Sequence, residues 1–128
     1  MILRTVLAVL VGSQLAGCSS DPSRSRDQVL SQLATAFVEQ LAKGEFENAS
    51  RSLGAPLTHA LSAEDLRKQW DMLIEHVGGF KSTLDTGIET QDGLTAVVVN
   101  CAFERQNAKV IPWFDDQSRI VKLFYDPR

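Results

Sequence analysis

Three titratable side chains in one expected helix could take part in acid–base chemistry. Asp71, Glu75 and His76 follow Trp70, and Asp71 and Glu75 are four residues apart, so they share a helix face. A carboxylate or imidazole in an apolar pocket can act as a general base, with Tyr125 as a donor to a developing oxyanion. The same spacing is typical of a solvated acidic helix edge, which we favour. We therefore expect a protein without catalytic activity, and keep an enzyme with an acid or histidine base as the alternative.

A second group of candidates lies on an expected strand. Alternation along residues 94–105 puts an apolar set on one face, which we expect to pack against helices: Thr95, Val97, Val99, Cys101 and Phe103. Asn100 and Glu104 lie on the other, mixed face, where they orient a ligand or simply form the wetter side of the sheet. Cys101 has no partner for an intramolecular disulfide, and we interpret it as a small buried hydrophobic residue.

An aromatic residue next to a proline is a candidate for contacts. Trp113 follows Pro112, and its side chain points away from that of Phe114, which we assign to the core. Exposed aromatic residues at sheet edges often mark contacts, so Trp113 is expected at a cavity mouth or an interface. The candidate pocket or interface residues are therefore Trp70, Asp71, Asn100, Glu104, Trp113 and Tyr125. His59 is a further acid–base candidate, in a loop or short turn.

Composition narrows the function classes. The chain has 128 residues, 13 Lys and Arg, 16 Asp and Glu, and a net charge of −3, with a pI near 5.3. A nucleic-acid surface requires clustered basic residues and a basic pI, so that class is not expected. Two histidines and two cysteines indicate neither a metal cluster nor a disulfide framework, and we expect no metal and no cofactor.

The N-terminus has the pattern of an export signal. One basic residue, Arg4, precedes an apolar run that is too short to span a membrane. The run ends in Leu15-Ala16-Gly17-Cys18, which resembles the lipobox of bacterial lipoproteins. That resemblance implies cleavage between Gly17 and Cys18, acylation of Cys18 and a membrane anchor in the cell envelope. Ser19 rather than Asp follows the cysteine, which by the same resemblance implies the outer membrane, facing the periplasm, if the source has two membranes.

Three segments follow from this pattern. Residues 1–17 are expected to be the signal peptide. Residues 18–26 are polar after the cysteine and are expected to form a lipidated flexible tether. Arg24 and Arg26 could touch anionic head groups, but we favour a solvated tether. Residues 27–128 are expected to fold as a single α+β domain.

The spacing of apolar residues predicts helices first and strands afterwards. Helices are expected over residues 27–44, 45–53, 55–61 and 62–77, with Leu33 on the apolar stripe of the first and Ser62 as the N-cap of the last. Strands are expected over 80–88, 94–105, 108–114 and 119–125, with a tight turn at Asp92-Gly93. Pro112 indicates an edge strand, a bulge or an early strand end. The order predicts an antiparallel meander with helices packed on one face.

The chain resembles the bacterial domain-of-unknown-function family 3887. The matching residues are diffuse packing positions: Gly44, Phe46, Leu66, Trp70, Gly79-Phe80, Phe114-Asp115, Ile120 and Leu123 to Pro127. The resemblance implies a cystatin-like roll of the nuclear-transport-factor-2-like superfamily, a curved sheet around helices with a conical cavity. It implies no activity, since superfamily members include isomerases, dehydratases and binding modules.

We therefore expect a membrane-anchored envelope lipoprotein whose domain is a non-catalytic binding module. Its partner is expected to be a small apolar ligand, another protein or a second copy of the chain. The alternative is a lipid-anchored cavity enzyme of the isomerase or dehydratase kind.

Overall fold

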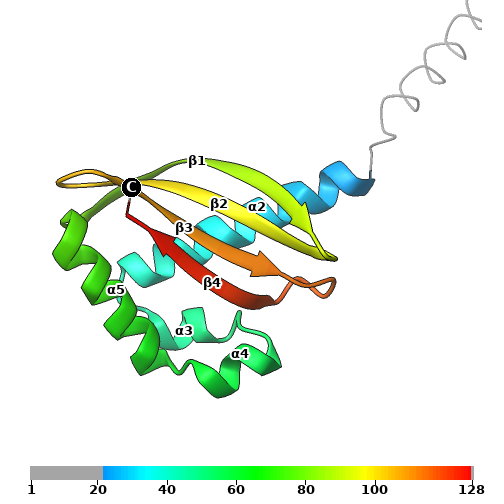
Figure 1. Ribbon diagram of the computed structural model, residues 1–128, viewed down its shortest axis with the longest axis horizontal. Helices are drawn as coiled ribbons and strands as arrows, with labels where there is room; N and C mark the ends of the chain where they lie inside the picture. Colours follow the sequence, from blue (N-terminus) through cyan, green and yellow to red (C-terminus); the bar gives the residue numbers. More distant parts are fainter. Residues whose placement is uncertain (1–21, 128) are drawn as a thin grey trace, which may run out of the picture.

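The structure is a computed structural model that describes residues 22–127 of the chain. Within these residues, four helices precede four strands (Figure 1), as the apolar spacing predicts. The elements are α2 (Pro22–Ala42), α3 (Phe46–Ser50), α4 (Ala55–Ala60), α5 (Ala63–Val77), β1 (Phe80–Gln91), β2 (Leu94–Phe103), β3 (Asn107–Phe114) and β4 (Ile120–Asp126). The strands form one antiparallel sheet in the order β1-β2-β3-β4, which confirms the α+β class.

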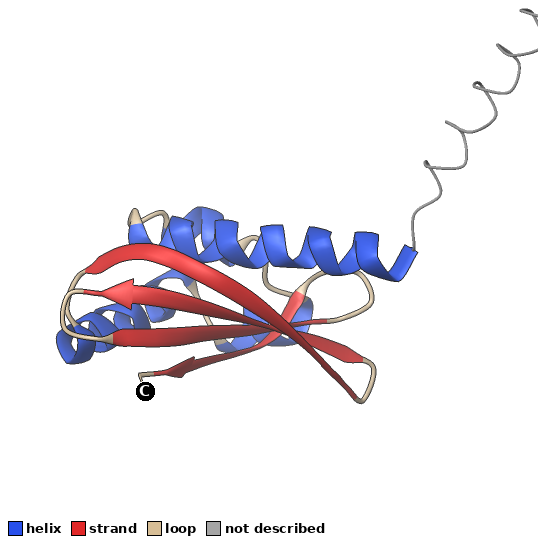
Figure 2. Ribbon diagram, turned by 90° about the horizontal axis from the view of Figure 1, so that it is seen from above, coloured by secondary structure: helices blue, strands red, loops and turns tan. Residues whose placement is uncertain are grey.

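The helices leave one face of the sheet uncovered. Figure 2 shows α2 lying along one face, and Figure 1 shows the opposite face with no helix across it. The covered face is the predicted one, because Val97, Val99, Cys101 and Phe103 of β2 are all buried. We refer to the uncovered side as the outer face of the sheet. Among the described residues, no helix is both long and apolar enough to cross a membrane.

Helix α2 begins earlier than its apolar spacing predicts. It starts at Pro22, so residues 22–26, expected in the flexible tether, belong to the helix. Proline suits a first turn because its missing N–H has no intrahelical partner there. The helix ends at Ala42, and Gly44, with φ +80°, terminates it as predicted. Gly44 N–H donates to Leu41 O and Glu45 N–H to Gln40 O, a Schellman motif.

Arg26 contacts protein instead of presenting its charge outward. Its guanidinium donates to the backbone oxygen of Asp115 at 2.8 Å and to Ser118 Oγ at 3.3 Å. These contacts join the first turns of α2 to the β3–β4 turn. Arg26 therefore belongs to the folded domain rather than to a solvated tether.

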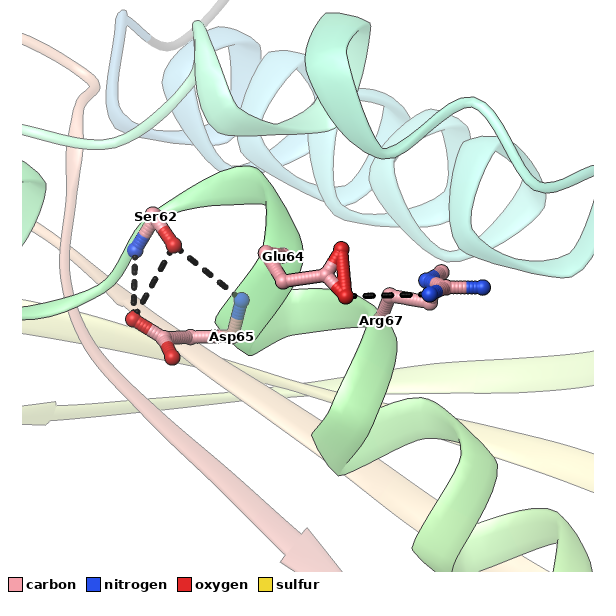
Figure 3. A network of polar contacts seen from close by, with 4 residues as sticks. All are labelled: Ser62, Glu64, Asp65 and Arg67. Carbon is pink, nitrogen blue, oxygen red and sulfur yellow. Dashed lines mark hydrogen bonds and ion pairs between the residues drawn. The ribbon is translucent and has the colours of Figure 1, made fainter.

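Helix α5 begins with a capping box (Figure 3). Ser62 Oγ accepts from Asp65 N–H at 3.2 Å, and Asp65 Oδ2 accepts from Ser62 N–H at 3.0 Å. Glu64 and Arg67 form an exposed ion pair one turn on, at 3.0 Å. The box orients the helix that carries one wall of the site described below.

The core lies between the helices and the covered face of the sheet. Leu66, Trp70, Leu73 and Val77 of α5 are buried as their spacing predicts. Leu33 of α2 is 41% exposed, so its assignment to the apolar stripe is wrong. Leu33 lies beside the buried face of α2, which is formed by Leu30, Ala34, Phe37, Val38 and Leu41. The large core side chains include those of Phe37 and Phe114, which are fully buried.

Pro112 lies in an inner strand, so the predictions of an edge strand and of an early end are wrong. Its ring is fully buried, and β3 continues to Phe114. No pairing with β2 is formed at Pro112, since the bridges pass from Ala96↔Trp113 to Val99↔Val110. A proline cannot donate to the ladder, which explains the gap. The predicted bulge is present one residue later, between Trp113 and Phe114 on the β4 side.

Candidate functional site

A surface pocket opens between α5 and the C-terminal end of β4. Its volume is about 340 Å³, and its lining is mostly apolar. Residues from the helix wall are Gln69, Met72, Leu73 and His76, and those from the C-terminal segment are Tyr125 and Pro127. Apolar pockets with a few polar groups are typical of small-molecule sites, and this volume lies at the small end of their range.

Two polar atoms at this pocket are buried without a partner. Tyr125 Oη and Gln69 Oε1 are the buried side-chain oxygen atoms of the described residues that have no hydrogen-bond partner. An unsatisfied buried donor or acceptor costs about 1–3 kcal/mol of stability. Both residues line the same pocket, so a ligand with matching groups could recover that cost.

The phenol of Tyr125 acts as a neutral group. Burial raises the pKa of Tyr125 well above its usual range, so the hydroxyl keeps its proton and remains a donor. Tyr125 packs against the core and pairs with Val110 across the β3–β4 ladder. Its ring is therefore fixed by the sheet, whereas Met72 opposite is 69% exposed. A long unbranched thioether side chain at the rim can adapt to different occupants.

Two hydrogen bonds brace the walls of the pocket. Gln106 Nε2 donates to the carbonyl oxygen of Pro127, which holds the end of the chain beside the β2–β3 turn. Arg105 Nη1 donates to the carbonyl oxygen of Glu75 at 2.7 Å, in the last turn of α5. Helix and chain end are thus both tied to the same β2–β3 connection.

The residues singled out in the second half of α5 are not brought together at the pocket. Trp70 is buried in a ring cluster, with centroids 6.1 Å from Phe80 and 5.8 Å from Phe103, and it belongs to the core. Asp71 and Glu75 are exposed and line none of the pocket between α5 and β4. Among the acid–base candidates, His76 and Tyr125 alone line it.

Asn100 and Glu104 have structural partners of their own. Asn100 Nδ2 donates to Asp85 Oδ1 at 2.6 Å across the β1–β2 ladder. Glu104 Oε1 accepts from Gly79 N–H at 2.8 Å and so braces the junction of α5 and β1. Neither lines the pocket between α5 and β4.

The other candidates lie elsewhere on the molecule. Trp113 is half-buried on the outer face of the sheet, with Lys122 Nζ 5.7 Å from its ring centroid. His59 is exposed near the end of α4. Cys101 is a free, buried thiol whose pKa burial raises to about 12, which confirms its assignment to the core. Gly17 and Cys18, the cleavage and lipidation positions, lie outside the described residues.

Sequence reasoning missed four of the six lining residues. Gln69, Met72 and Leu73 went unnoticed as a group, although with His76 they recur at three and four residues, the spacing of one helix face. Pro127 also went unassigned. Within residues 22–127, no cluster of three potential metal ligands is present.

Comparison with known proteins gives a family match. A family model described as "Protein of unknown function (DUF3887)" matches residues 34–123, which include every element from the middle of α2 to β4. No curated protein and no solved structure matches the chain.

Proposed function

The chain belongs to the DUF3887 family, whose description assigns no function, and from the site itself we propose that it is a non-catalytic module for a small apolar ligand. The observation that carries the proposal is the pairing of an apolar pocket with two unpartnered buried oxygens, Tyr125 Oη and Gln69 Oε1. Buried polar groups with a purely structural role normally have hydrogen-bond partners. Two such groups without partners at one pocket therefore support a binding role.

The two oxygens define the ligand chemistry. The protonated phenol donates, whereas the amide oxygen of Gln69 accepts. A matching group must therefore accept and donate at once, as a hydroxyl or an unsubstituted amide does. The apolar lining, including Leu73 and Pro127, suits a short hydrocarbon body. The exposed Met72 side chain at the rim is unbranched and can adapt to such a ligand.

Two isomeric probes test this chemistry. Octan-1-ol donates and accepts, whereas methyl heptyl ether has the same formula and only accepts. We expect the lipid-free chain, residues 19–128, to bind octan-1-ol about tenfold more tightly than the ether, the cost of leaving one buried group unpaired. Chemical-shift titration of the Met72 methyl and of the backbone amides near Tyr125 measures both affinities.

Two variants complete the experiment. Gln69→Met should remove most of the discrimination, because the ether differs from the alcohol in being unable to donate to Gln69 Oε1, and it should leave the fold as stable as before or slightly more stable, because it deletes an unsatisfied amide oxygen. Met72→Ala should weaken both probes alike, and His59→Ala, far from the pocket in the sequence and exposed, is the matched control. Equal affinities for the alcohol and the ether in the unaltered chain would exclude the proposal.

We further propose that the module is a lipoprotein held at a membrane by acyl chains on Cys18. The support is the Leu15-Ala16-Gly17-Cys18 pattern after a basic and apolar N-terminus. Two or three chains on one cysteine bind a bilayer stably, whereas one does so only marginally. Cys18→Ser should abolish palmitate labelling and cleavage before residue 18; unchanged labelling would refute the anchor.

The finer fold relationship is also a proposal. Helices packed inside a curved antiparallel sheet support a place in the nuclear-transport-factor-2-like superfamily (Figure 2). An enzyme remains the second candidate, because His76 and Tyr125 line one pocket. It requires turnover of a carbonyl substrate that His76→Gln abolishes. We favour binding, because the pocket has no carboxylate in its lining.

A further inference from the structure

The outer face of the sheet carries an apolar row that nothing in the described chain covers. Gly87 of β1 pairs with Val98 of β2, and Ile111 of β3 pairs with Phe124 of β4. The unshifted β2–β3 register between Ala96↔Trp113 and Val99↔Val110 puts Val98 opposite Ile111. The row therefore crosses the whole sheet. Phe124 at one end is 53% exposed, and Gly87 at the other end has no side chain.

The adjacent row carries opposite charges at its two ends. Glu89 pairs with Ala96, Ala96 with Trp113, and Trp113 with Lys122. Glu89 and Lys122 are both exposed and lie on the two edge strands, β1 and β4. The two ends of each row are thus complementary to each other. One row has the ring of Phe124 and Gly87 at its ends, and the other has Lys122 and Glu89.

We propose that this face binds the same face of a second copy of the chain, about a two-fold axis parallel to the strands. Rotation about such an axis leaves each row at the same position along the strands. It places β1 of one copy opposite β4 of the other. Phe124 then meets Gly87 of the other copy, Lys122 meets Glu89, and Val98 meets Ile111. A two-fold contact requires a self-complementary surface, and these two rows provide one.

The perpendicular orientation of the axis is unfavourable. An axis across the strands would place β1 against β1 and bring Glu89 toward Asp85 of the other copy, a like-charge contact. Under the parallel axis, the next row, Asp85, Asn100, Lys109 and Asp126, carries a net charge of −1 and brings Asp85 toward Asp126 of the other copy. Lys109 lies between the two acids in each copy, and Asp85 already accepts from Asn100. The contact therefore centres on the Gly87 and Glu89 rows.

The size of the face sets the expected strength. Four strands about 4.8 Å apart and about seven residues long offer on the order of 450 Å² per copy. Stable interfaces bury about 800 Å² per partner, so the dimer is expected to be weak, with a dissociation constant in the micromolar range. Tethering two copies in one membrane would raise their effective concentration.

Gly87→Val is the sharpest test. A Cβ at Gly87 meets nothing within 4 Å, and the residue does not have a positive φ, so the fold accepts a side chain there. The valine would fill the space that Phe124 of the other copy occupies. In sedimentation velocity of the full chain in detergent, we expect Gly87→Val and Phe124→Ala each to weaken dimerisation at least about tenfold, with an unchanged melting temperature for Gly87→Val.

A charge exchange tests the orientation. Lys122→Glu should weaken the dimer about fivefold, and the double variant Glu89→Lys with Lys122→Glu should restore it, because the pair forms between copies. Lys68→Glu, an exposed charge on α5, is the matched control and should change nothing. Tyr125→Phe should also leave the dimer unchanged, which separates this inference from the pocket.

Cross-linking in membranes gives an independent measurement. Full chains with Gly87→Cys and with Phe124→Cys, expressed together, should form a disulfide-linked pair on mild oxidation. Gly87→Cys expressed with Met72→Cys, an exposed position on α5, should not. The proposal would be overturned if the chain stayed monomeric up to about 200 µM, or if Gly87→Val and Phe124→Ala left the dissociation constant of the dimer unchanged.

Discussion

Arg26 in α2 donates a hydrogen bond to the backbone oxygen of Asp115 at 2.8 Å, across 89 residues of sequence. The same guanidinium reaches Ser118 Oγ, and Asp115 Oδ1 accepts from the backbone N–H groups of Gln117 and Arg119. The β3–β4 turn is therefore organised around Asp115 and held by the beginning of the chain's first described helix. This contact unites the two ends of the domain's sequence.

Arg26→Ala is expected to lower the free energy of unfolding by about 1 kcal/mol, because a charge-assisted hydrogen bond in a half-buried position is lost. Arg26→Lys should recover little, since a single ammonium cannot reach Asp115 O and Ser118 Oγ with the same fork. Urea unfolding measures both. Lys68→Ala, an exposed cation on α5, is the control and should change stability far less.

Ser62→Ala is expected to cost about 1 kcal/mol through loss of the capping box of α5. Hydrogen bonds from the Ser62 backbone and side chain lower the pKa of Asp65 below its usual range. A lowered folded-state pKa contributes stability above the unfolded pKa, near 3.9, that is lost as the pH falls through the folded value. Acid titration below about pH 4 should therefore destabilise the unaltered chain more steeply than Ser62→Ala; parallel curves would contradict this.

A series of three glycines should give graded effects. Gly78 has φ +91°, and an added Cβ would lie 2.8 Å from Glu104 Cβ, so Gly78→Ala combines strain with overlap and should cost about 3 kcal/mol or more. Gly44 has φ +80° with open space, so Gly44→Ala should cost about 1 kcal/mol. Gly87→Ala meets neither obstacle and should be neutral or stabilising. Thermal unfolding ranks the three.

Cys101 should resist alkylation in the folded chain. Its thiol is buried, its pKa is raised to about 12, and it donates weakly to Val99 O at 3.6 Å. Because the thiolate is the reactive form, iodoacetamide at pH 8 should label Cys101 only after unfolding. The measurement uses the Cys18→Ser chain and mass spectrometry; rapid labelling of the native protein would show that β2 opens locally.

The sequence pattern predicts most of the fold because each element carries a local signal. Ser62 and Asp65 mark the start of α5, Asp92-Gly93 marks the first hairpin, and apolar alternation marks β2. Pro112 was misleading because its cost depends on a tertiary feature, a gap in the β2–β3 ladder that leaves its missing N–H without consequence. The beginning of α2 was missed because residues 22–26 have no apolar stripe, and their helix is held by Arg26 instead.

The site was less predictable than the fold. Tyr125 was singled out, but the other lining residues come from two turns of α5, and only the approach of α5 to the end of β4 brings Gln69 and His76 to the same pocket. Asn100 and Glu104 have the residue types of ligand-binding groups, yet each has a partner close by in the sheet or at its edge. Whether a polar side chain is satisfied depends on neighbours distant in sequence, which spacing alone does not report.

The start of α2 at Pro22 and the pocket lie at opposite ends of the domain. In Figure 1 the helix starts at the end of the molecule where the β3–β4 turn lies, and the chain end beside the pocket is at the other. An anchor at Cys18 would have only four residues to Pro22, a reach of at most about 14 Å. The pocket would then open on the aqueous side, distal to the bilayer, and would collect its ligand from solution. A two-fold axis along the strands keeps both anchors at one end, so a pair could stand on a single membrane with both pockets outermost.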